Sequence, residues 1–102
     1  MPIDREYIRR LQRAIAHLHD CGATHVDTVP VHETFEGETV WQGDVEVFWV
    51  NHSKAGVAYA WSYKDADGYE RCAAVLGRRP INSPLDAVKA FLMSGARRMA
   101  GG

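Results

Sequence analysis

Hydrophobic residues near the start of the chain recur at steps of three and four, the spacing that places them on one side of an α-helix. Asp4 precedes this stretch and can accept hydrogen bonds from the first free N–H groups of a helix. Gly22 follows it and can take the left-handed backbone that ends one. The pattern therefore predicts an N-terminal helix whose buried stripe is Tyr7, Ile8, Leu11, Ala14, Ile15 and Leu18.

From Thr24 to Leu76 the hydrophobic period changes from three or four residues to two, which is typical of β-strands. Gly37 marks the first turn, and a polar loop at 51–56 marks the second. Asp67-Gly68 favours a tight two-residue turn, because both residue types tolerate positive φ. The alternation predicts four strands, at roughly 24–33, 39–50, 56–64 and 69–76.

Two residues inside these strands indicate where a strand lies in the sheet or where it is irregular. Pro30 has no backbone N–H to donate to a neighbouring strand, so the first strand is expected at an edge of the sheet. Gly43 interrupts the second strand, and a glycine there predicts a bulge or a bend.

A second helix is predicted near the C-terminus. Ser83 can cap it, Pro84 suits its first position, and Asp86 stands three residues after the cap. Leu85, Val88, Phe91 and Leu92 form its apolar stripe, Gly95 is expected to end it, and residues 96–102 are expected to be a frayed tail. The chain of 102 residues is thus predicted to be one α+β domain (1–102), a four-stranded antiparallel meander flanked by an N-terminal and a C-terminal helix, α-β-β-β-β-α.

Alternation sorts the strand residues into two faces. One face is bulky, and a slip in the hairpin at 51–56 would mix it with the other. Its members are Val45, Val47, Trp49, Val57, Tyr59, Trp61 and Tyr63, joined by Cys72, Ala74 and Leu76 if Asp67-Gly68 forms a tight turn.

The opposite face is small and apolar for a surface in water. Either the C-terminal helix covers it, or a second copy of the chain packs on it as a homodimer, the commonest assembly of small proteins. We expect it to be an interaction surface made of Asp44, Glu46, Phe48, Ala58, Ala60, Ala73 and Val75.

Charge is distributed unevenly although the formal net charge is only −1. Residues 21–50 contain six acidic side chains and no Lys or Arg, while the predicted helices carry arginines. Fields of opposite sign govern which partners approach a surface. The sequence therefore favours a non-catalytic interaction module that associates with itself and presents its acidic strands to a basic partner.

The motifs that the sequence lacks, and its composition, argue against several classes of function. The sequence contains no Gly-rich phosphate loop, no nucleophile elbow and no HExxH motif, so neither an enzyme nor a cofactor is predicted. Two cysteines are too few for a disulfide scaffold, and the composition is that of a globular protein. With no run of about 18 apolar residues and no apolar signal segment, a cytoplasmic protein without a membrane span is expected.

Nucleic-acid binding is the first alternative. Arg9, Arg10 and Arg13 lie on the polar side of the predicted N-terminal helix. The order of helices and strands superficially resembles a double-stranded-RNA-binding domain, which implies phosphate contacts. That family begins its last helix with a lysine cluster, whereas this chain has Ser83-Pro84-Leu85-Asp86 there, and the acidic strands would repel phosphate.

Metal binding is a weaker alternative. His17, His19, Cys21 and His25 form the densest group of zinc-type ligands in the chain. Residues two apart on a helix point in nearly opposite directions, so His17 and His19 would not share a face. No second ligand pair with the usual spacing completes a site.

Overall fold

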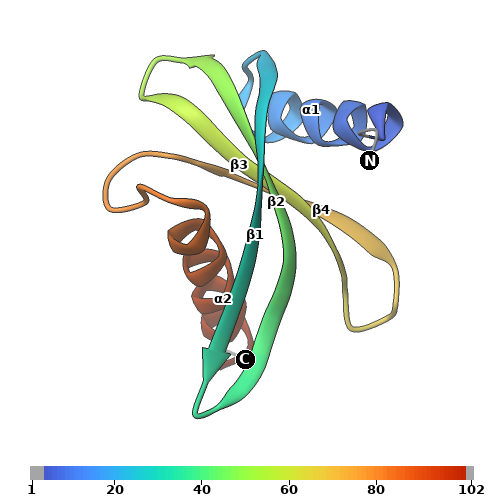
Figure 1. Cartoon of the computed structure of the whole chain (residues 1–102), viewed down its shortest axis with the longest axis vertical. Helices are drawn as coiled ribbons and strands as arrows, with labels where there is room; N and C mark the ends of the chain where they lie inside the picture. The colour runs from blue at the N-terminus through green and yellow to red at the C-terminus, as the bar shows by residue number, and fades with distance from the viewer. Residues whose placement is uncertain (1–3, 101–102) are drawn as a thin grey trace.

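The computed structural model describes residues 4–100, and the side chains of residues 4–94 (Figure 1). It confirms the predicted α+β architecture, an antiparallel meander with a helix at each end. The elements are α1 (Arg5–His19), β1 (Ala23–Phe35), β2 (Glu38–His52), β3 (Ala55–Lys64), β4 (Glu70–Leu76) and α2 (Pro84–Ala100).

The four strands form one sheet in the order β1-β2-β3-β4, so each strand lies beside its neighbours in sequence. Pro30 is accordingly on an edge strand, as its missing N–H predicts. Figure 1 shows the β1–β2 hairpin and the β3–β4 hairpin crossing near the middle of the sheet, with their turns pointing in different directions. The sheet therefore consists of two hairpins joined along part of their length.

Helix α1 begins as the sequence predicts and ends differently. The Asp4 carboxylate accepts hydrogen bonds from the backbone N–H groups of Glu6 and Tyr7, at 3.1 and 3.2 Å. At the other end, Asp20 takes the left-handed conformation with φ 53°, where Gly22 was expected to do so. A short polar side chain tolerates this backbone, so the left-handed cap lies two residues before the glycine.

Helix α2 has the predicted start. The backbone N–H of Asp86 donates to the Ser83 hydroxyl at 3.1 Å, and the Asp86 carboxylate accepts from the backbone N–H of Asn82. Ser83 thus satisfies the backbone N–H of Asp86, and Asp86 satisfies that of Asn82, one residue before the cap, so the contacts resemble a capping box without being reciprocal.

The predicted end of α2 is wrong, because the helix passes Gly95 and continues to Ala100. A glycine inside a helix costs only about 1 kcal/mol relative to alanine, and the alanines, arginines and methionine that follow favour a helix. Residues 96–100, expected to be frayed, are therefore helical, while 101–102 lie outside the described residues. Within residues 4–100, neither helix is long and apolar enough to cross a membrane.

The register between β2 and β3 is the predicted one. Val47 stands opposite Tyr59, and Trp49 opposite Val57, so the bulky residues of both strands share a face. The β1–β2 turn is also as predicted: Glu36 and Gly37 both have positive φ, at 52° and 82°, which gives a two-residue turn between Phe35 and Glu38.

The predicted register of β4 is wrong by one residue. The connection from Lys64 to Glu70 is a five-residue loop rather than a tight turn at Asp67-Gly68. A shift of one residue reverses the face of every side chain in a strand. Ala73 and Val75 therefore join the bulky face, opposite Trp61 and Tyr59, while the set expected there faces the other way, namely Cys72, Ala74 and Leu76.

The longer loop forms around one carboxylate. Asp65 accepts hydrogen bonds from the backbone N–H groups of Asp67 and Tyr69, both at 3.0 Å, and from Nε of Arg71 at 2.9 Å. These contacts, with the Arg71 hydrogen bond the largest, lower the pKa of the Asp65 carboxyl. The loop thus has its own anchor, and this anchor favours it over the tight turn.

Two separate cores hold the sheet. On the bulky face, α2 packs on a cluster that includes Val31, Val45 and Trp61. On the small face, Ile8, Leu11 and Ile15 of α1 pack on three strand residues, namely Phe48, Ala58 and Ala60. The small side chains let the helix lie close to the sheet, which explains a face that looked too apolar for water.

Candidate functional site

The apolar residues predicted to form an exposed interaction surface are covered within the chain itself. Phe48, Ala58 and Ala60 have no exposed surface because α1 lies over them. Ala73, 4% exposed, and Val75 face α2 on the other side of the sheet. The seven predicted residues therefore do not share one face, and a homodimer would have to use other side chains.

Glu46, another of the predicted residues, is a buried carboxylate with two partners. Its residue is 5% exposed, and its Oε1 lies 2.8 Å from Nε2 of His25. The hydroxyl of Thr28 donates a hydrogen bond to the same oxygen. Both partners belong to β1, so the cluster fastens the edge strand to β2 and keeps the carboxylate satisfied.

This cluster does not have the geometry of a catalytic triad. A triad uses the two ring nitrogens of histidine to contact the acid and the nucleophile separately. Here the same nitrogen of His25 faces the Glu46 carboxylate at 2.8 Å and the Thr28 hydroxyl at 3.5 Å. The arrangement joins β1 to β2 and lacks the two-sided histidine contact of a triad.

The four residues of the metal alternative do not converge. His25 is engaged with Glu46, and Nε2 of His19 lies 2.8 Å from the backbone carbonyl oxygen of Ala74. His17 is exposed in the last turn of α1, and Cys21 is half-buried against the α1 core. Across residues 4–100 there is no group of three or more His, Cys, Asp or Glu side chains that could hold a metal ion.

Two of the three arginines of the nucleic-acid alternative already face acids. Arg9 lies 3.5 Å from Glu6, and Arg10 lies 3.1 Å from Glu70. The Arg10 contact raises the pKa of its guanidinium and lowers the pKa of the Glu70 carboxyl, mainly through the hydrogen bond between them. Of these three arginines, Arg13 alone is exposed with no acidic partner among the described side chains, which is a weak footprint for a phosphate backbone.

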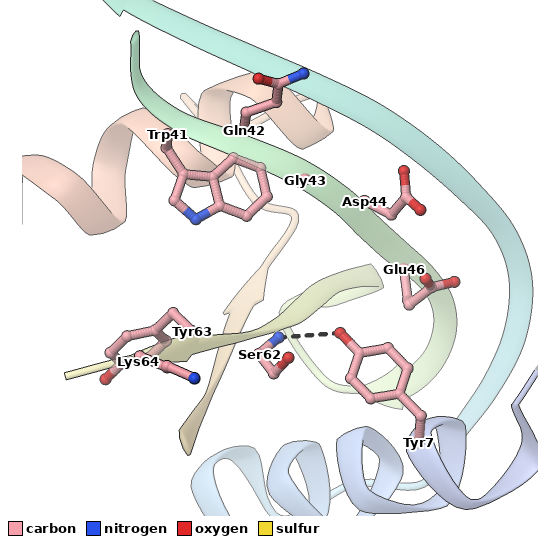
Figure 2. Close-up of a pocket in the computed structure, with 9 residues that line it drawn as sticks. All are labelled: Tyr7, Trp41, Gln42, Gly43, Asp44, Glu46, Ser62, Tyr63 and Lys64. Carbon is pink, nitrogen blue, oxygen red and sulfur yellow. Dashed lines mark hydrogen bonds between the residues drawn. The ribbon is translucent and has the colours of Figure 1, made fainter. Parts of the chain in front are cut away.

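A cleft lies where the two hairpins separate. β2 and β3 pair from His52 and Ala55 as far as Glu46 and Ala60, and no further. Beyond that point β2 continues to Glu38 beside β1, while β3 continues with β4. The gap between them holds a cavity of about 610 Å³, a size ordinary for ligand pockets (Figure 2).

The walls of the cleft combine aromatic and charged side chains from three elements (Figure 2). Tyr7 reaches in from α1, and its hydroxyl accepts a hydrogen bond from the backbone N–H of Ser62 at 3.0 Å. Trp41 and Tyr63 supply aromatic rings from β2 and β3. The remaining side chains include an exposed acid, Asp44, and an exposed base, Lys64.

Gly43 shapes the β2 wall. It stands in regular register opposite Val31, so of the bulge or bend predicted at this glycine the bulge is wrong; the register shifts between β1 and β2 lie near Val26 and Val40 instead. The indole of Trp41 lies over Gly43, where a Cβ atom would come within 3.1 Å of the ring. The missing side chain thus makes room for Trp41, whose ring also contacts Trp61 edge-on at 5.8 Å.

Asp44 is the acid that the cleft leaves open. Its residue is exposed, and among the described side chains no basic group lies within ion-pair distance of its carboxylate. The surrounding hairpin belongs to the segment 21–50, which has no Lys or Arg. A positively charged group in the cleft would therefore meet a carboxylate without an ion-pair partner on the β2 side, while the ammonium group of Lys64 lines the β3 side.

Sequence reasoning found part of this cleft. Asp44 and Glu46 were among the predicted residues, but Tyr7 and Tyr63 were assigned to core faces, and Trp41 was given no place. The unusual pairing of a tryptophan with a glycine two residues later was the one local signal, because an aromatic ring often covers a strand glycine. No family model, curated protein or solved structure matches this chain.

Proposed function

We propose that this chain is a non-catalytic interaction module that binds a basic segment of a partner protein in the cleft between β2 and β3. The carrying observation is the separation of the hairpins beyond Glu46 and Ala60, which opens a cavity beside the unpaired Asp44 carboxylate. Aromatic rings of Tyr7, Trp41 and Tyr63 can contact the stems and the cationic heads of Lys or Arg side chains. The acidic strand region is still the binding surface, but it binds through the cleft that Asp44 and Glu46 line and not through a face of the sheet.

The test is a calorimetric titration with a short lysine-rich peptide at low and high salt. Asp44→Lys removes the acid from the cleft and should weaken binding by about tenfold or more, because like charges now face each other. Glu38→Lys makes the same change in net charge at the exposed tip of the hairpin, outside the cleft, and should have a small effect. Equal losses in both variants would show a non-specific field and count against the cleft.

Homodimer formation is a separate prediction, and it concerns a surface other than the one first expected. Trp49 is 64% exposed on the α2 side of the sheet, which makes it a large apolar contact open to a second copy. Light scattering of the parent and of Trp49→Ser, at low and high salt, decides the question. A dimer that persists in salt and disappears in the variant supports it, and a monomer throughout removes it.

A further inference from the structure

Beyond Glu46 and Ala60, the edges of β2 and β3 that face each other across the cleft pair with no other strand. If the β2–β3 ladder continued past Glu46 and Ala60, Asp44 would face Ser62 and Gln42 would face Lys64, but neither pair forms. The residues of both walls nevertheless have extended backbone and remain paired on their outer sides. Unpaired strand edges are sites where an extended peptide can add.

The direction of the backbone groups follows from two observations. The N–H of Ser62 donates to Tyr7 across the cleft, so the backbone of Ser62, and by alternation that of Ala60, faces β2. Ala60 is paired with Glu46, and alternation along β2 then turns the backbone groups of Asp44 and Gln42 into the cleft.

The other side of β2 agrees with this direction. Pro30 stands opposite Asp44 on β1 and has no N–H, so it donates no hydrogen bond to the Asp44 carbonyl oxygen. A proline tolerates this place because the backbone of Asp44 faces the other way.

The two edges are not equally available. The Ser62 N–H on β3 is already satisfied by the Tyr7 hydroxyl, which occupies the position that a peptide carbonyl would take. No side chain of the described residues donates to, or accepts from, the backbone of Gln42 or Asp44. The open edge is therefore that of β2.

We propose, resting on the function proposed above, that the basic segment binds as an extended strand antiparallel to β2, along its inner edge at Gln42–Asp44. Residues directly opposite each other in a sheet share a face. A Lys or Arg opposite Asp44 then meets its carboxylate, and the neighbouring ligand residue, opposite Gly43, lies on the face covered by the Trp41 indole. The recognised sequence thus alternates basic and apolar residues.

The experiment uses four peptides with the same numbers of lysine and valine residues. In the first peptide lysine and valine alternate, and in the second the lysines are contiguous. The third and fourth are the alternating peptide with N-methyl groups on its lysine amides or on its valine amides. The lysine amides are those that face β2 in the proposed pairing, so methylation there removes the hydrogen bonds of one edge only.

The expected result is binding of the alternating and the valine-methylated peptides, with a loss of about tenfold or more on methylation of the lysine amides. In the complex, hydrogen exchange measured by NMR should slow at the amides of Gln42 and Asp44. Equal affinity of all four peptides, still lowered by Asp44→Lys, would overturn strand addition and leave a basic-ligand cleft. Failure of every peptide to bind would overturn both proposals.

Discussion

The indole of Trp41 covers Gly43 so closely that a Cβ atom at position 43 would lie 3.1 Å from its ring. Because Trp41 also rests edge-on against Trp61, its ring has little freedom to withdraw. Gly43→Ala should therefore lower the free energy of unfolding by about 1 kcal/mol through overpacking. Chemical denaturation measures the loss.

A double-mutant cycle isolates this contact. In a Trp41→Ala background the ring is gone, and Gly43→Ala should become neutral or stabilising because alanine restricts the unfolded chain. A cost that persists unchanged without the ring would show that backbone geometry, rather than the indole, requires glycine there.

Ala60→Glu tests where α1 sits. Ala60 has no exposed surface and lies in the cluster formed with Leu11 and Ile15 of α1. A carboxylate there would be an unpaired buried charge, which costs about 3–5 kcal/mol. The variant should lose its cooperative thermal transition by circular dichroism, whereas Ala66→Glu, in the exposed β3–β4 loop, should melt like the parent. A folded, stable Ala60→Glu chain would mean that α1 does not cover this face.

Glu46→Gln tests the cluster that joins β1 to β2. The amide keeps the size of the side chain but removes the charge that His25 and Thr28 face. The variant should lose about 1.5–3 kcal/mol of stability, the range for hydrogen bonds to a charged group. Glu38→Gln, on the exposed hairpin tip, is the control in urea denaturation and should unfold with the parent. Identical midpoints for both variants would contradict a structural role for the buried carboxylate.

The loop around Asp65 predicts a dependence of stability on acid pH. The Arg71 hydrogen bond, together with the backbone N–H groups of Tyr69 and Asp67, lowers the pKa of the Asp65 carboxyl below its ordinary 3.8. A lowered pKa contributes stability above the ordinary value, and this contribution disappears as the pH falls through the lowered one. The difference in unfolding free energy between the parent and Asp65→Asn should therefore be full near neutrality and shrink below pH 3.8.

Asp67→Asn is the matched control for this pH series. It lies in the same loop and contributes a backbone N–H to Asp65 rather than an acceptor. Its difference from the parent should not follow the same curve. A constant difference between the parent and Asp65→Asn from pH 7 to pH 2 would show that the carboxylate charge does not stabilise the loop.

Local patterns predicted most of the fold because each depends on residues close in sequence. The Asp4 and Ser83 caps, the turn at Gly37 and the edge position of Pro30 all follow from backbone chemistry within a few residues. The register of β4 does not follow from backbone chemistry within a few residues. Asp65 recruits Arg71 across the loop, and this contact replaces the tight turn that Asp67-Gly68 favours on local grounds.

The cleft was harder to predict for a similar reason. It exists because β2 and β3 stop pairing at Glu46 and Ala60, although each strand continues as a strand. A hydrophobic period of two indicates that a segment is extended, but it does not indicate which neighbour the segment keeps. Asp44 was predicted as a binding residue from its charge, while Tyr7 enters the same cleft from a helix remote in sequence.

The placement of α1 has a consequence for the order in which the chain folds during its synthesis. Tyr7 contacts Ser62 and His19 contacts Ala74 across 55 positions, and Arg10 contacts Glu70 across 60. At a translation rate of about 5–20 residues per second, the helix waits roughly 3–12 s for these partners to be made. A lone helix of 15 residues is only marginally stable in water. Helix α1 is thus synthesised before the strands on which it packs, and its docking has to wait for β3 and β4.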